Sequence, residues 1–163
     1  MTEADIPAFI TCARRYFASL EGESTLVIEP PFLRDEPGPF LEFTGIIVVS
    51  GRKQGAVCFS ATGGMLDKIL GLLKDEKGKD EARRDLVGEI ANTLSGNVRE
   101  EFGSEFRISV PWIEQGTVVN FRFPPKVRTY VIPLNWKAQK AYLLICLHTP
   151  VEATRATFEQ NLS

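Results

Sequence analysis

The stretch from Asp85 to Phe102 constrains the fold more than any other part of the chain, because its pattern predicts one long amphipathic helix. An ideal helix turns by about 100° per residue. The apolar residues of the stretch fall on one side of that wheel: Leu86, Val87, Ile90, Ala91, Leu94 and Val98. A helix with such an apolar stripe is stable only against a core, so the other elements must supply one.

The opposite side of this predicted helix, its front, carries Asp85, Glu89, Asn92 and Gly96 within a sector of roughly 60°. Glu89 and Asn92 are three residues apart, so their side chains project side by side. Gly88 and Gly96 lie at or beside this front, and each costs about 1 kcal/mol of helix propensity relative to alanine. Two such costs suggest that something approaches the helix backbone closely. The simpler alternative is a solvated face with small residues for packing.

Further helices and strands are predicted on both sides of this segment. Apolar residues at three- and four-residue spacing predict helices over residues 5–20 and 65–74. Alternating apolar and polar residues predict the strands, which cover 26–29, 40–50, 55–60, 106–112, 118–123, 127–134 and 140–147. Residues 32–39 are interpreted as a loop or a proline-interrupted edge strand, and 74–81 as a charged, solvated connection. This order of helix, strands, two helices and strands favours an α+β fold, with long helices packed on an antiparallel sheet.

Local signals refine the ends of these elements. Asp5 is the predicted N-cap of the first helix, and Gly22 its end. The polar residues Arg14, Arg15 and Tyr16 are interpreted as the solvated face of that helix. A turn is predicted at residues 135–137, between the last two strands.

Length and composition are typical of an ordinary globular protein. The chain has 163 residues, of which 44% are apolar and 25% charged, with a net charge of −2. We expect a single domain over residues 1–148 and a polar tail over 149–163. Basic residues form no stripe and no apolar run approaches the ~20 residues that cross a bilayer, so we expect neither nucleic acid nor membrane as a partner. The N-terminus resembles no signal segment, and we expect the cytosol.

Cysteine and histidine offer little chemistry. Cys12, Cys58 and Cys146 are widely spaced, lie in apolar patterns and form no CxxC pair, so we interpret them as buried free thiols. His148 is the one histidine, and no GxSxG motif accompanies it. We therefore predict no metal site and no catalytic triad within the chain.

The helix and its surroundings resemble the CheC/CheX family of chemotaxis phosphatases. The resemblance rests on Asp85, Glu89 and Asn92 in the helix and on Pro111 in the following strand. The segments 55–59, 65–69 and 108–116 also resemble the elements around the family's central helix, so the likeness covers about residues 5 to 147. A single copy of the motif points to the CheX-like branch, because CheC carries the motif twice.

This resemblance implies a function and assigns separate roles to this chain and to its partner. The family dephosphorylates the phospho-aspartate of the response regulator CheY, and CheX-like members are typically homodimers joined by their sheets. The resemblance assigns Glu89 to a salt bridge with the regulator's active-site lysine, and Asn92 to the water that attacks the acyl phosphate. Mg²⁺ and the phosphorylated aspartate would come from the regulator's active site, which leaves this chain with no cofactor of its own.

The chemistry of these residues is compatible with that role. A carboxamide both donates to and accepts from a water, and it does not repel a phosphoryl group as a carboxylate does. Gly88 and Gly96 would keep the helix front slim enough to enter a partner's cleft, and Asp85 would add a supporting contact. The alternative is a non-catalytic module that binds receivers or assembles as flagellar-switch proteins do.

Overall fold

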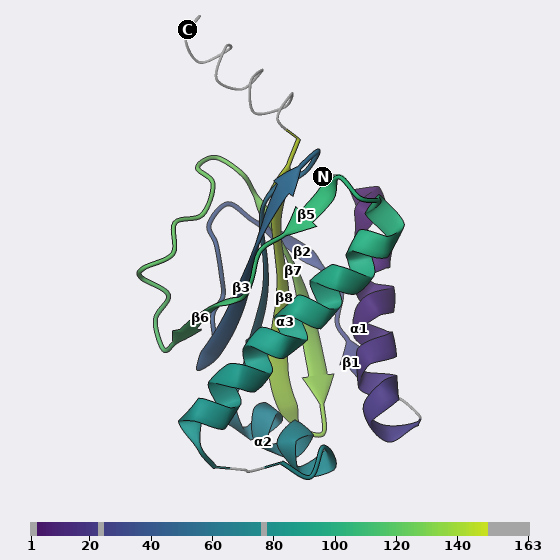
Figure 1. Ribbon diagram of the computed structural model, residues 1–163, viewed down its shortest axis with the longest axis vertical. Helices are drawn as coiled ribbons and strands as arrows, with labels where there is room; N and C mark the ends of the chain where they lie inside the picture. The colour runs from purple at the N-terminus through teal and green to yellow at the C-terminus, as the bar shows by residue number, and fades with distance from the viewer. Residues whose placement is uncertain (1–2, 23–24, 76–77, 150–163) are drawn as a thin grey trace, which may run out of the picture.

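A computed structural model describes residues 3–22, 25–75 and 78–149 of the chain (Figure 1). The helical elements are η1 Glu3–Asp5, α1 Ile6–Glu21, α2 Gly63–Leu72 and α3 Asp80–Phe102. The strands are β1 Val27–Ile28, β2 Phe32–Arg34, β3 Phe43–Gly51, β4 Gln54–Ala61, β5 Phe106–Ile108, β6 Trp112–Gln115, β7 Thr129–Trp136 and β8 Gln139–His148. The predicted tail, residues 149–163, lies outside the described residues except for Thr149.

The strands form one antiparallel sheet in the order β1-β7-β8-β4-β3-β5. Two short strands lie off this path, because β2 also pairs with β7 and β6 also pairs with β3. The predicted α+β class, with helices packed on an antiparallel sheet, is therefore confirmed.

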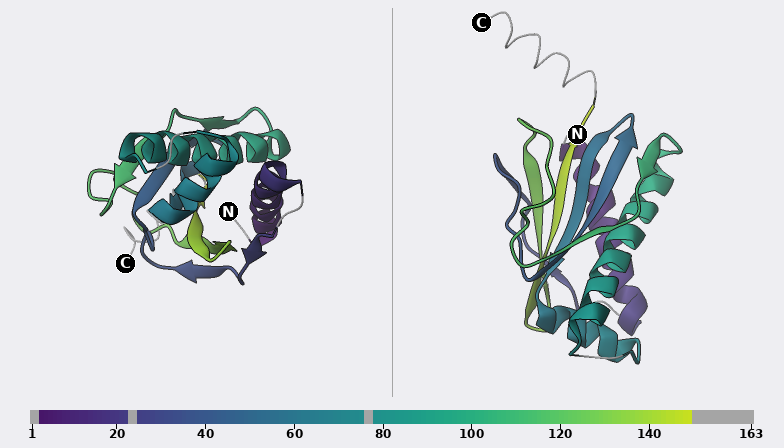
Figure 2. Two further views of the ribbon diagram at one scale, coloured as in Figure 1. Left: turned by 90° about the horizontal axis from the view of Figure 1, so that it is seen from below. Right: turned by 60° about the vertical axis from the view of Figure 1, so that its left-hand side comes forward.

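α1 and α3 cover one face of this sheet, with α3 crossing it diagonally, and α2 lies at one end of the sheet (Figures 1 and 2). The core lies between these two layers and includes Phe9 and Phe17 of α1 and Trp136 of β7, all fully buried. At Gly45 of β3 the helix touches the strand without a side chain between them. A Cβ added to Gly45 would lie 2.5 Å from the carbonyl oxygen of Val87, so only glycine permits this approach.

The strand predicted over 106–112 is divided by an irregular step. β5 pairs with the end of β3 and β6 with its beginning, while residues 109–111 leave the ladder. Ser109 stabilises the step by two hydrogen bonds to Val48. Its backbone N–H donates to the Val48 carbonyl over 2.9 Å, and its Oγ accepts from the Val48 N–H, also over 2.9 Å. A serine hydroxyl thus replaces a ladder carbonyl, and Pro111 is turned towards α3.

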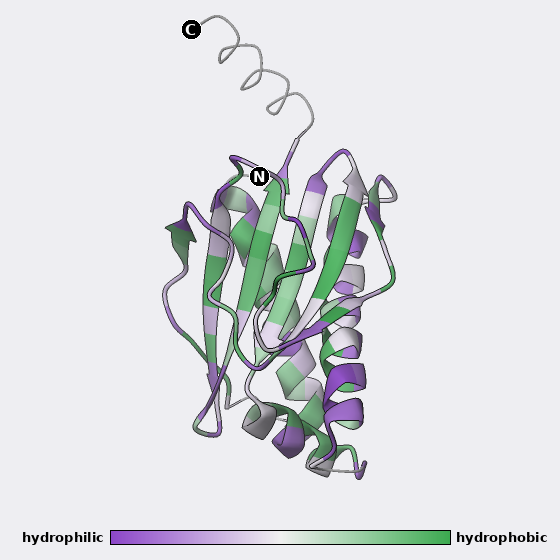
Figure 3. Ribbon diagram, turned by 90° about the vertical axis from the view of Figure 1, so that its left-hand side faces the viewer, coloured by the Kyte–Doolittle hydropathy of each residue, from purple (hydrophilic) through white to green (hydrophobic). Residues whose placement is uncertain are grey.

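The strand predicted over 118–123 is wrong, because the segment is irregular. The segment instead covers the second face of the sheet (Figure 3). Its side chains Val118, Phe121 and Phe123 pack against a buried cluster that includes Ile46, Cys58 and Leu144, whereas Val119 is 71% exposed. The rings of Phe121 and Phe123 meet edge to face, with their centroids 4.8 Å apart. Partial burial of Phe121 and Phe123, with exposed Arg122 between them, therefore explains the alternation at this end of the segment without strand pairing.

Two smaller predictions about element ends need adjustment. The turn predicted at 135–137 lies at Lys137 and Ala138, which have φ angles of 49° and 63°. Trp136 remains in β7 because its ring is buried and its indole N–H donates to the Glu21 carboxylate over 3.1 Å. Asp5 occupies the N-cap position of α1, as predicted, but its side chain makes no capping hydrogen bond and forms an ion pair with Lys53 at 3.3 Å instead.

Candidate functional site

The front of α3 is exposed, as its pattern predicts, and its back is buried. Asp85, Glu89 and Asn92 are all exposed, whereas Leu86, Ile90 and Leu94 are at most 3% exposed. Among the residues that the structure describes, no hydrogen bond or ion pair engages the side chains of Asp85, Glu89 or Asn92. These three side chains therefore project from a rigid helix with their polar atoms available to a partner.

The two glycines of α3 have different surroundings. A Cβ on Gly96 would meet no described heavy atom within 4 Å, so this position is open on its outer side. A Cβ on Gly88 would lie 3.0 Å from Cδ1 of Ile113 and 3.3 Å from Cβ of Pro111. Gly88 is buried, and its missing side chain makes room for the chain's own β6 region. The prediction that Gly88 keeps the helix front slim is therefore wrong, because Gly88 is buried inside the protein. Of the two glycines, only Gly96 remains a candidate for that role.

The same contact places Pro111 beside the motif helix. The irregular step at 109–111 carries Pro111 out of the ladder and against Gly88. Gly88 precedes Asn92 by about one helical turn. The four motif residues singled out in the sequence are therefore brought to one region, three on α3 and Pro111 packed against that helix.

Tyr16 of α1 flanks this front, which the sequence pattern did not reveal. Its ring is partly buried against the core, edge to face with Phe17 at 5.4 Å between centroids. Burial raises the pKa of the Tyr16 phenol far above its usual range, and the nearby Glu89 carboxylate raises it further. Tyr16 is thus part of the α1–α3 contact rather than of a solvated face.

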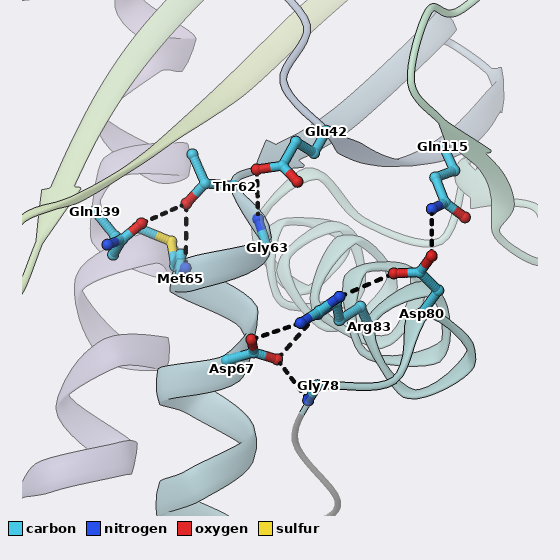
Figure 4. A network of polar contacts seen from close by, with 10 residues as sticks. All are labelled: Glu42, Thr62, Gly63, Met65, Asp67, Gly78, Asp80, Arg83, Gln115 and Gln139. Atoms are coloured by element: carbon cyan, nitrogen blue, oxygen red, sulfur yellow. Dashed lines mark hydrogen bonds and ion pairs between the residues drawn. The ribbon is translucent and has the colours of Figure 1, made fainter.

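A network of polar contacts anchors the first turns of α3 (Figure 4). The guanidinium of Arg83 donates twice to Asp67 of α2, over 3.0 and 2.7 Å, and once to Asp80 over 2.9 Å. Gln115 of β6 donates to the other oxygen of Asp80 over 2.8 Å. The paired acceptors raise the pKa of Arg83, and the Gln115 and Arg83 hydrogen bonds lower that of Asp80.

This network corrects the interpretation of residues 74–81 as a merely solvated connection, because Asp80 joins α3 to β6. The start of α2 is fixed in the same region (Figure 4). Thr62 caps α2 by accepting from the Met65 N–H over 3.1 Å, while its hydroxyl donates to Gln139 over 2.8 Å. These contacts thereby hold α2 and the first turns of α3 at one end of the sheet. Asp85 and Glu89 lie on the adjoining part of α3.

A cleft of about 360 Å³ separates the end of α2 from the first half of α3 and reaches Glu89. Leu73, which follows α2 and is 49% exposed, forms part of its wall. Charged residues also line the cleft: Asp75, Lys79, Glu81, Asp85 and Glu89. The helix front is therefore continuous with a hollow that another protein's side chain can enter.

In the described part of the chain, no three His, Cys, Asp or Glu residues gather in a way that could hold a metal ion. None of the helices described there combines the length and the apolar character that crossing a membrane requires.

Comparison with known proteins identifies the family. The family model described as chemotaxis phosphatase CheX matches residues 43–135, which is more than half of the chain. The fold and the exposed motif thus define a protein of the CheC/CheX class. More particularly, the chain belongs to the CheX family. A search of curated protein sequences finds no match.

Solved structures share this fold. The chemotaxis protein CheX from Vibrio vulnificus has a TM-score of 0.75 and 19% identity, over 89% of this chain and 99% of that one. A CheX–CheY–BeF3–Mg²⁺ complex from Borrelia burgdorferi contains a chain with a TM-score of 0.69 and 16% identity, over 88% of this chain and 97% of that one. The FliM middle domain from H. pylori is less similar, with a TM-score of 0.58 and 10% identity, over 96% and 97% of the two chains.

Proposed function

We propose that this chain hydrolyses the phospho-aspartate of a CheY-type response regulator, with Glu89 and Asn92 as its working pair. The observation that carries the proposal is the exposure of these two side chains, side by side and unpaired within the described residues, on the motif helix of a CheX-family chain. The Borrelia burgdorferi CheX–CheY complex supports a receiver as the partner.

In this proposal the two residues have separate tasks. Asn92 holds a water in line with the acyl phosphate, because its carboxamide can accept one hydrogen bond from the water and donate another. Glu89 forms a charge-assisted bond to a lysine of the receiver and so fixes the complex. The receiver contributes the phosphorylated aspartate and Mg²⁺, which neutralises charge on the phosphoryl group.

Such a mechanism depends on positioning, and the structure supports it. Hydrolysis by an oriented water gains from a fixed geometry of the reacting groups. α3 rests directly on β3 at Gly45, Pro111 lies against Gly88, and the contacts of Arg83 hold the first turns. These contacts limit rotation and sliding of the helix, so the spacing between Glu89 and Asn92 is set before the receiver binds.

The test follows phosphate release from a phosphorylated CheY-type receiver in the presence of Mg²⁺. We expect Asn92→Ala to abolish the acceleration while largely preserving complex formation, and Glu89→Ala to weaken association as well. Thr93→Ala and Glu100→Ala are matched controls, because both residues are exposed on α3 outside the motif. Equal release by wild type and both motif variants would refute the proposal.

The second candidate is a non-catalytic module that binds receivers or assembles as flagellar-switch proteins do, and the FliM middle domain from H. pylori shares the fold. Binding of the receiver without faster phosphate release would support this alternative. We also propose that the chain is a homodimer, as its resemblance to CheX-like proteins implies. Light scattering of the purified full chain tests the oligomeric state directly.

A further inference from the structure

The cleft beside Glu89 is lined mainly by polar and charged groups, with one well-exposed leucine among them. Leu70 and Leu86 are almost fully buried at its base, at 2% and 3% exposure, while Leu73 is 49% exposed on its wall. The charged lining residues comprise four carboxylates, Asp75, Glu81, Asp85 and Glu89, and one ammonium group, Lys79. The lining of the cleft therefore has an excess of negative charge, and Leu73 is its most exposed apolar side chain.

A lysine or arginine side chain fits this combination of surfaces. Such side chains bury an apolar stem along apolar surface and keep their charged head in a polar environment. Asp85 and Glu89 are four residues apart on α3, so their side chains are neighbours on the helix surface, with Cβ atoms about 5–6 Å apart. A cation in the cleft would thus lie beside the receiver contact proposed for Glu89.

We propose that the cleft between α2 and α3 binds a basic side chain from the surface of the partner receiver, adjacent to its phosphorylation site. This inference rests on the proposed function and deepens it. Leu73 packs against the aliphatic stem, and Asp85 meets the positive head. The contact makes Leu73 and Asp85 specificity-determining residues, because a receiver with an acidic residue there is repelled.

Leu72 and Leu73 offer a matched pair for the test. They are neighbours at the end of α2 and similarly exposed, at 43% and 49%, but only Leu73 lines the cleft. The full chain is assayed for phosphate release from the phosphorylated CheY-type receivers of its source organism. Leu73→Ser should raise the KM about fivefold, as expected for the loss of about 1 kcal/mol of packing, with kcat unchanged. Leu72→Ser should leave both constants unchanged.

Variants of Asp85 test the electrostatic part of the proposed contact. Asp85→Asn should raise the KM by up to about fivefold, the range of an exposed ion pair, and should reduce the dependence of KM on salt. Asp85→Lys should raise the KM further. Glu100→Gln, an exposed carboxylate of α3 outside the cleft, is the control for net charge.

The outcomes distinguish this inference from the function on which it rests. If Asn92→Ala abolishes release but Leu73→Ser behaves like Leu72→Ser, or Asp85→Asn like Glu100→Gln, the cleft contact is refuted and the phosphatase stands. If wild type accelerates release from none of the receivers, the proposed function fails, and the inference falls with it. A rise in KM confined to the Leu73 and Asp85 variants supports the contact.

Discussion

Exchange of each α3 glycine for alanine separates internal packing from partner binding. A helix interior loses about 1 kcal/mol with glycine in place of alanine. At Gly96 the added Cβ meets no described heavy atom within 4 Å, so Gly96→Ala should gain that full amount. For a chain of this size the gain corresponds to a rise in Tm of about 2–4 °C.

At Gly88 the same gain is opposed by a clash. The added Cβ would lie 3.0 Å from Cδ1 of Ile113 and 3.3 Å from Cβ of Pro111, so both neighbours must shift. Overpacking of this kind costs about 1–3 kcal/mol. The net result for Gly88→Ala should lie between no change and a loss of about 2 kcal/mol in the free energy of unfolding.

Urea unfolding followed by circular dichroism gives both free energies. In parallel, binding to a receiver loaded with beryllofluoride and Mg²⁺ reports on the helix front. We expect Gly96→Ala to bind about tenfold more weakly, a loss of about 1.4 kcal/mol, although it folds more stably. Equal stabilisation by both variants would contradict the packing argument, and unchanged binding of Gly96→Ala would contradict the slim front.

Two further predictions concern the support of α3. Gly45→Ala should lower the free energy of unfolding by about 2–3 kcal/mol, the upper part of the range for overpacking, because the added Cβ would lie 2.5 Å from the carbonyl oxygen of Val87. An unchanged free energy in urea unfolding would argue against this close contact. Burial and Glu89 raise the pKa of Tyr16, so the unfolded chain ionises first and stability should fall as pH rises through about 10. Tyr16→Phe should show a shallower fall in urea unfolding across that range, and equal slopes would disprove a perturbed Tyr16.

The helices were predictable because their signals are local. The 23 residues of α3 carry an apolar stripe that needs no knowledge of the partner elements. Residues 118–123 show the opposite case, since their alternation matches a strand while their aromatic side chains cover the second face of the sheet. Alternation reports which side chains are buried, and it does not distinguish a ladder from a covering loop.

Of the candidate site, only the part that lies on a single helix was predictable from the sequence. Glu89 and Asn92 share one helix, so their neighbourhood follows from spacing alone. Tyr16 and Leu73 reach the site from α1 and from the residues after α2, so only tertiary packing brings them there. The contact between Gly88 and Pro111 is of the same kind, because it depends on an irregular step that Ser109 creates by bonding Val48.

The contact at Gly45 also determines how tolerant the motif is to change elsewhere. Where two backbones touch, no rotamer adjustment can alter their separation, whereas side chains around them can exchange volume. The contact at Gly45 therefore sets a minimum separation between α3 and the sheet at this point. Conservative exchanges in the core should thus alter stability before they alter the position of Asn92 relative to the sheet.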